Sequence, residues 1–282
     1  MTFAVTAKAK RRRICAGAAA AALVAMPVSS ASAIDFLRGS VPSYSKWDGG
    51  YVGVTMNATA AHSNFSSGAG DLVAFILRNT TMENEGHVSS WSTSAPADAR
   101  GNGFGAFFGW NYQIDPTLVL GWEVAYTRFN NALTMNSSDA MTRVFDESTG
   151  YTATVSLATN VSLTIRDYGT FRARAGYAMG QFLPYAFVGL AVGRVTLSRS
   201  ATVTTQEADN TGGGRPTLNS GPTTMTDSSG KIAYGFATGL GTEITILPNM
   251  FLRAEYEFVQ FAPIGGSRAY MHTGRVGVGL KF

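Results

Sequence analysis

The chain has 282 residues, 45% of them hydrophobic, with one cysteine and a formal net charge of +4 at pH 7. Five of the 22 basic residues and none of the 18 acidic ones precede Ile34, so the remainder carries 17 basic and 18 acidic residues, a net of −1. Those basic residues are scattered singly, which excludes a nucleic-acid-binding patch. The cysteine also precedes Ile34, which excludes disulfides, thiolate metal sites and catalytic thiols from the remainder.

Residues 1–33 are predicted to be a secretory signal peptide. Basic residues at 8–13 are followed by an apolar stretch from Ile14 to Val28, and a small-residue cleavage site precedes Ile34. A transmembrane helix would need roughly 20 apolar residues, which this stretch lacks. The paired arginines are only weak support for twin-arginine export. A lipoprotein anchored through Cys15 also has weak support, because no lipobox precedes that cysteine. Residues 34–48 are then a periplasmic segment, and 49–282 form the main domain.

A short helix is predicted inside the first long polar segment, over residues 71–78. Asp71 is a candidate N-cap, and Leu72, Phe75 and Ile76 fall on one helical face. Such a helix is either a lid over the adjoining domain or a surface contact for an extracellular partner or lipopolysaccharide.

Short turns alternate with long polar segments along the rest of the chain. Turn signals occur at Asp115-Pro116, 181–184 and 247–249, and Ser/Thr/Asn/Gly-rich segments lie near 63–100, 131–163 and 200–229. The predicted strands between them are 50–62, 101–114, 117–130, 164–180, 183–199, 230–246, 250–261 and 269–282. This pattern predicts an all-β fold, namely an eight-stranded antiparallel transmembrane up-and-down β-barrel with short periplasmic turns and long extracellular loops.

Side-chain alternation favours a membrane barrel over a soluble one. Large apolar side chains share one face of most predicted strands, and glycine, Glu123 or Glu243 lies on the other. A soluble barrel would hold its large residues inside, whereas here the inner positions carry charge and glycine. Both faces of the fifth strand are apolar from Phe187 to Val195, so the pattern leaves its orientation open.

The predicted lumen holds four acids and four bases. Their strands are near enough for pairing, and an eight-stranded barrel is only wide enough for its own side chains, so an ion-pair network that fills the interior is expected. A narrow selective pore is the alternative reading of the same residues. The candidate residues are Glu123, Arg172, Arg174, Glu243, Arg253, Glu255, Glu257 and Arg275.

Enzymatic activity is not expected. His62 and His272 are predicted near the extracellular rim on the first and last strands, and His87 lies in a loop. A lipid-modifying enzyme would place histidine with serine or an acid at that rim, but no spacing here supports such a site. No ligand cluster implies a cofactor or a metal.

The last strand ends on an aromatic residue. Its ending resembles the sorting signal of bacterial outer-membrane barrels, in which a polar residue, a glycine and two apolar residues recur at fixed spacing. The matching positions are Arg275, Gly277, Leu280 and Phe282. The resemblance implies recognition by the barrel-assembly machinery, after escort by periplasmic chaperones.

Four further segments carry a family resemblance: 47–53, 168–177, 182–185 and 252–256. They resemble the porin-like surface antigens of alphaproteobacteria, a family of small outer-membrane β-barrels similar to the transmembrane domain of OmpA. The resemblance implies an eight-stranded barrel that acts in envelope integrity and in host or surface contact. We expect a monomer that sits in outer-membrane lipid and lipopolysaccharide, with its loops available to an extracellular partner. The chain ends at Phe282 without OmpA's peptidoglycan-binding domain, so anchoring to peptidoglycan is not expected.

Overall fold

The computed structural model describes residues 47–65, 68–91, 94–265 and 267–282. The predicted signal peptide and all but the last two residues of the predicted segment 34–48 therefore lie outside the described residues. Among the helices in these ranges, none has the length and apolar character to cross a membrane.

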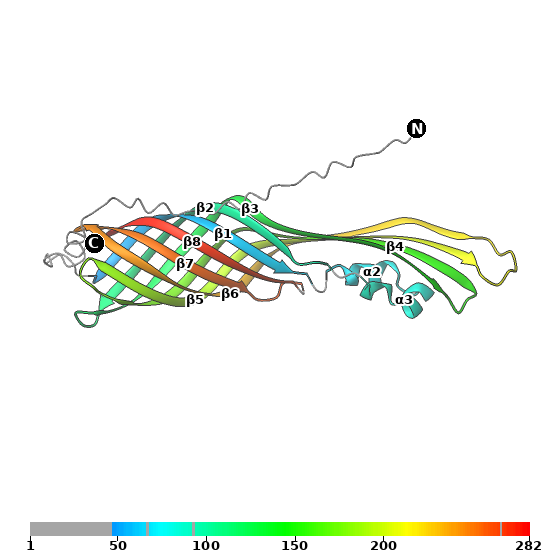
Figure 1. Ribbon diagram of the computed structural model, residues 1–282, viewed down its shortest axis with the longest axis horizontal. Coiled ribbons are helices and arrows are strands. Elements are labelled where there is room, and N and C mark those ends of the chain that lie inside the picture. The colour runs from blue at the N-terminus through cyan, green and yellow to red at the C-terminus, as the bar shows by residue number, and fades with distance from the viewer. Residues whose placement is uncertain (1–46, 66–67, 92–93, 266) are drawn as a thin grey trace, which may run out of the picture. The chain divides into compact units, whose positions relative to one another are not determined.

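Eight antiparallel strands close into one barrel, which confirms the predicted fold class (Figure 1). Each strand pairs with its neighbours in sequence, and β1 closes the ring on β8 from Tyr51 opposite Lys281 to Asn64 opposite Arg268. The strands are β1 (Gly49–Asn64), β2 (Ala97–Gln113), β3 (Leu118–Asp146), β4 (Tyr151–Tyr177), β5 (Phe182–Asp209), β6 (Leu218–Leu247), β7 (Met250–Phe261) and β8 (Arg268–Lys281). Short turns join the strands at one end, as predicted.

Large apolar side chains face outward around the barrel. Phe104 of β2 is 56% exposed and Leu240 of β6 is 63% exposed, as the period-two pattern predicts. β5 follows the same rule, because Val188, Leu190 and Val192 are exposed whereas its odd-numbered residues from Leu183 to Val195 face inward. So large an exposed apolar belt marks a surface that lipid covers.

Four strands continue beyond the ring, where the sequence predicts loops. The predicted loops near 131–163 and 200–229 are mostly strand, since β3, β4, β5 and β6 pair out to Asp146 opposite Thr152 and Glu207 opposite Leu218. We call this part, residues 133–165 and 195–232, the extension. The Ser- and Thr-rich composition predicts loops. Threonine is β-branched, however, and favours strands when the opposite face of the sheet is covered by other side chains.

The two faces of the extension differ. The inward face continues the barrel interior and buries apolar side chains such as Val155, Leu163 and Val203. The outward face carries few charges, because hydroxyl and amide side chains occupy most of its positions. One cross-strand row of this face contains Asn136, Ser162, Ser198 and Ser228. Hydroxyl pairs link neighbouring strands, with Thr202 Oγ1 lying 2.8 Å from Thr224 Oγ1.

The chain between β1 and β2 covers the inward face of the extension. It forms α2 (Gly70–Ile76), α3 (Thr81–Gly86) and the 3₁₀ turn η1 (Val88–Ser90), which lie beside the extension in Figure 1. α2 packs on β5 and β6, and the Trp91 ring stacks edge-on against Phe145 of β3 at 5.9 Å. These elements supply the apolar partners that let the four strands continue outside the ring.

Candidate functional site

The eight predicted lumen residues meet in one buried layer inside the barrel. None is more than 6% exposed, and their side chains come from β3, β4, β6, β7 and β8. Three pairs are direct neighbours in the strand register: Glu123 with Arg172, Glu243 with Arg253, and Glu255 with Arg275. Because alternation aims every second side chain inward, correct registers alone bring these charges together.

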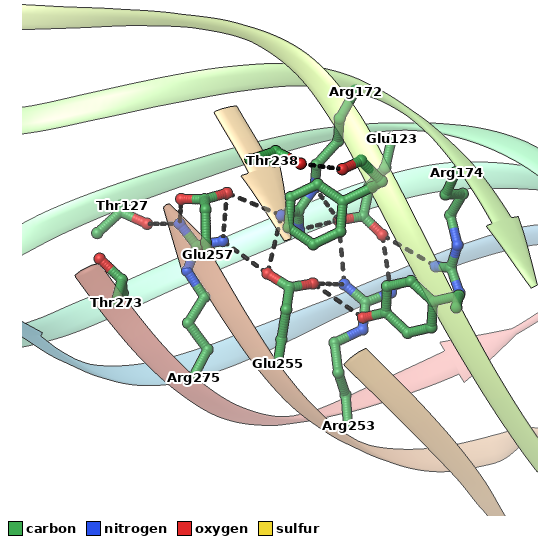
Figure 2. Close-up of polar contacts among 12 residues, drawn as sticks. Glu123, Thr127, Arg172, Arg174, Thr238, Arg253, Glu255, Glu257, Thr273 and Arg275 are labelled. Carbon is green, nitrogen blue, oxygen red and sulfur yellow. Dashed lines mark hydrogen bonds and ion pairs between the residues drawn. The ribbon is translucent and has the colours of Figure 1, made fainter. Parts of the chain in front are cut away.

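Other contacts cross the lumen. Arg253 of β7 donates to both carboxylate oxygens of Glu123 on the opposite strand β3, at 3.0 and 2.7 Å. The Nη1 group of Arg172 on β4 donates hydrogen bonds to Glu255 at 2.8 Å and to Glu257 at 2.9 Å. In Figure 2 the contacts run without a break from Thr127, through Arg275, Glu257, Arg172 and Glu123, to Arg174.

Tyrosine hydroxyls complete the coordination of the carboxylates. Tyr51 donates to Glu123, Tyr185 to Glu255 and Tyr168 to Glu257, with distances of 2.8 to 2.9 Å. Aromatic rings also cover the guanidinium groups, since Arg253 lies 3.7 Å from the Phe107 ring centroid and Arg174 lies 3.9 Å from that of Tyr185. Each charge has an opposite charge beside it, and all of these charges except Glu243 also contact a hydroxyl group or an aromatic ring, which offsets their desolvation.

Apolar side chains close the lumen on both sides of the charged layer. Towards the short turns, Trp47 is 1% exposed, packs with Val119 and Leu183, and donates from Nε1 to the carbonyl of Gly180 at 3.2 Å. Towards the extension, Phe261 and Met271 are buried in the large cluster that continues under the helices. The charged layer is therefore packed between two apolar clusters.

The charged layer is suited to a structural role. Its four arginines and four glutamates cancel, and the arginines and carboxylates are engaged with one another. The residues that the structure describes contain no group of three His, Cys, Asp or Glu side chains placed to hold a metal ion. The layer therefore ties five strands together across the ring.

The far end of the extension has its own polar cap. Asp209 accepts hydrogen bonds from the Thr211 hydroxyl at 2.6 Å and from the Arg215 amide at 3.0 Å, and these lower its pKa to about 2. Arg215 donates to the carbonyls of Thr149 and Gly150 in the neighbouring hairpin, at 3.0 Å each, and lies 3.8 Å from the Tyr151 ring centroid. The tips of the two hairpins are thus held together.

The helix predicted at 71–78 begins earlier and is used differently. α2 starts at Gly70 with Ala69 as its cap residue, so Asp71 is not an N-cap; it instead pairs with Arg199 of β5 at 2.8 Å. Leu72 is buried on the extension, Ile76 is partly buried, and Phe75 is 51% exposed. Leu72 is therefore unavailable to a partner, because the helix needs an apolar face for its own docking. Contact through Phe75 stays a prediction.

The rim histidines both lie on the outer surface. His62 Nδ1 is 2.6 Å from Asp98, and His272 Nδ1 is 2.6 Å from the Tyr256 hydroxyl. The ring of His62 packs on Tyr270, which also contacts His272, so the two histidines are near neighbours across the β1–β8 seam. In β8, Arg275 and Gly277 face the lumen, while Leu280 and Phe282 are exposed. Their role in assembly stays a prediction.

Sequence reasoning missed two sets of residues. The sequence pattern predicts polar residues or glycine at inward-facing positions, so it did not identify the aromatic residues that face the lumen. These residues are Tyr51, Phe107, Tyr168, Tyr185, Phe187 and Phe251. An outward row of Arg128, Asp167 and Arg194 was also missed, since its residues become neighbours only through strand register.

Comparison with known proteins gives a family match and distant relatives. A model of the outer membrane protein beta-barrel domain family matches residues 17–282. The 25 kDa outer-membrane immunogenic protein of Brucella ovis is 24% identical over 178 residues, which cover 63% of this chain and 62% of that protein, less than two thirds of its length.

Solved structures give weaker similarity. The attachment invasion locus protein Ail of Yersinia pestis is 13% identical with a TM-score of 0.36, covering 83% of this chain and 99% of Ail. Neisserial surface protein A is 13% identical with a TM-score of 0.29, covering 83% and 100%.

Proposed function

Because the chain belongs to the outer membrane protein beta-barrel domain family, and is thus an outer-membrane protein of Gram-negative bacteria, we propose that it is a non-conducting barrel that carries a rigid surface-exposed extension. In this role the barrel is the membrane anchor and contributes to envelope integrity, while the extension makes surface or host contacts. The short turns face the periplasm and the extension faces outward, as is general for such barrels.

The closed charged layer is the observation that carries the non-conducting role. A conducting lumen needs mobile water around its charges, whereas Glu257 and Arg172 are 0% and 2% exposed and bond to each other at 2.9 Å. The bidentate contact between Arg253 and Glu123 would have to break for an ion to pass. Breaking a buried pair costs about 3–5 kcal/mol, so open states are rare.

The extension supports the contact role. Its outward face is mostly an array of uncharged hydroxyl and amide groups on four paired strands, and the helical cover and the joined tips hold that array rigid. A preorganised surface loses little conformational entropy on binding. The Brucella relative is named as immunogenic, which is consistent with surface exposure of this family's extracellular segments.

Conductance in planar bilayers tests the non-conducting role. The folded protein, verified by its heat-dependent gel mobility, should insert without producing current steps. Discrete steps in the unmodified protein that change when Arg253→Gln and Glu255→Gln are introduced would favour a narrow pore instead.

Adhesion by whole bacteria tests the contact role. Cells that display the full chain should adhere to host cells or matrix proteins. Cells displaying a variant in which residues 136–162 and 198–228 are each replaced by Asn-Gly should not. Equal adhesion by the two strains, at equal surface levels, would contradict the contact role.

A further inference from the structure

A basic groove lies on the outer surface where the barrel meets the extension. Its volume is about 680 Å³, and it crosses β3, β4, β5 and β6. Three arginines, one lysine and one aspartate line it, so its side chains carry a net charge of +3. These residues are Arg128, Arg166, Asp167, Arg194 and Lys231.

The groove sits directly above the apolar belt. Strand register places Arg128, Asp167 and Arg194 side by side in one outward row that ends on Ile232. The next row towards the short turns contains Tyr126 and Tyr234, which are 44% and 64% exposed. Tyrosine concentrates at membrane–water boundaries, so the arginine row lies at the level of the lipid headgroups.

Breaks in strand pairing open the groove. Between β3 and β4 the register jumps from Arg128 to Leu133 on one strand and only from Asp167 to Ile165 on the other. Arg166 is the unpaired residue on β4 and is exposed. A bulge re-aims the side chain that it carries, so the break adds a third arginine beside the row of two.

The positive charge of the three arginines is only partly neutralised within the groove. Arg194 pairs with Asp167 through its Nε at 2.7 Å and through its Nη2, while its side chain stays 69% exposed. Arg128 and Arg166 are exposed as well, so one carboxylate faces three guanidinium groups. Guanidinium groups bind phosphate oxygens in bidentate fashion, and exposed apolar side chains below can hold acyl chains.

We propose that this groove binds the phosphate groups of a phosphorylated glycolipid of the outer leaflet, the lipid anchor of lipopolysaccharide. The acyl chains then lie along the belt formed by residues such as Val192 and Ile232, which are 44% and 61% exposed. This inference requires only that the barrel span the membrane, so it stands whether or not the lumen conducts.

Native mass spectrometry of the detergent-solubilised full protein tests the site, with diphosphoryl lipid A and its dephosphorylated form as probes. The diphosphoryl form should bind more tightly. Each arginine would make charge-assisted hydrogen bonds to phosphate, so Arg128→Gln and Arg194→Gln should each weaken binding by roughly tenfold or more. Asp167→Asn should strengthen it, because it removes the competing carboxylate without changing the shape of the side chain.

Arg100→Gln is the matched control, because Arg100 is an exposed arginine on β2, outside the groove. Its binding should equal that of the unmodified protein. Equal binding of the two lipid forms, an equal loss in Arg100→Gln, or full competition by inorganic phosphate at the lipid concentration would each overturn the proposal. Heat-dependent gel mobility of every variant separates lost binding from failed folding.

Discussion

Lumen glycines make room for the rings that surround the charged layer. A Cβ added to Gly279 would lie 2.2 Å from the Phe251 ring, whereas one added to Gly274 on the same strand would meet nothing within 4 Å. Alanine at either position changes the strand propensity, but only alanine at Gly279 clashes with a neighbouring ring. Comparing the two variants therefore separates the steric effect from the effect on strand propensity. We expect Gly279→Ala to lower the free energy of unfolding by about 1–3 kcal/mol.

Urea unfolding in lipid vesicles, followed by tryptophan fluorescence, measures this difference. Gly274→Ala should change the free energy of unfolding by less than about 0.5 kcal/mol, as ordinary surface substitutions do. Similar losses in both variants would contradict the packing argument.

Arg172 contacts three of the four lumen glutamates. It bonds to Glu123, Glu255 and Glu257, so Arg172→Met leaves buried carboxylates short of a partner. We expect a loss of about 3–5 kcal/mol in the free energy of unfolding.

A double-mutant cycle with Glu257→Gln measures how much of that loss belongs to one pair. The double variant should be more stable than the sum of the single losses predicts, by about 0.5–3 kcal/mol. Additive losses would show that the two residues act independently.

At this scale the sequence predicts which residues are charged and inward-facing, but not their partners. The alternation alone places Glu255 and Arg172 in the lumen. Their contact at 2.8 Å joins strands that are not neighbours in the ring. Such a contact depends on strand stagger around the whole barrel, which no local pattern encodes.

At the scale of elements, the tip of the β5–β6 hairpin should loosen in acid. The folded-state pKa of Asp209 is about 2, below its ordinary value of 3.8, because the hydroxyl and amide of Thr211 and the Arg215 amide donate to the carboxylate. The resulting stabilisation is present above pH about 4 and is lost as the pH falls towards 2.

Hydrogen exchange of the Thr211 and Arg215 amides follows this change. Their protection should drop across that pH window in the unmodified protein. In Asp209→Asn it should be low throughout and independent of pH. A pH-independent high protection in the unmodified protein would contradict the role of the carboxylate.

Trp91 fastens the helical segment to the extension. Its ring packs on Phe145, its Nε1 donates to the Gly86 carbonyl at 2.7 Å, and Arg143 lies 5.0 Å from its centroid. Trp91→Ala should release α3 and make residues 81–91 sensitive to protease, while the barrel keeps its heat-dependent mobility. Phe75→Ala is the control. Phe75 is exposed, so this substitution should leave the protease sensitivity of residues 81–91 unchanged.

The elements show why the sequence located the turns and misassigned the polar segments. Asp115 and Pro248 mark turns through local chemistry. The segments near 131–163 and 200–229 became strands because apolar residues such as Leu157 and Val203 alternate with threonine and serine, and α2 and α3 provide cover. That cover comes from a distant part of the chain, so composition alone suggested loops.

At the scale of the molecule, the barrel and the extension should be separable. All charged lumen contacts lie on the ring side of the register break at Arg128, and β1, β2, β7 and β8 contribute no strand to the extension. The variant with 136–162 and 198–228 replaced should therefore still fold into a heat-modifiable barrel in vesicles. Residues 68–91 should become protease-sensitive, because their docking surface is gone. Failure of this variant to fold would mean that the extension is needed to close the ring.

The extension ends in two strands whose outer edges have no partner within the described chain: β3 pairs with β2 only as far as Phe129, and β6 pairs with β7 only from Gly235. The unpaired backbone groups of an open edge can pair with a strand of another chain. In a crowded membrane such pairing would join neighbouring copies into aggregates. Along the β6 edge, Gly221 and Pro222 stand where pairing with β5 is interrupted, and proline has no amide hydrogen to offer an incoming strand. We expect this break to hinder edge-to-edge pairing between copies on one cell surface.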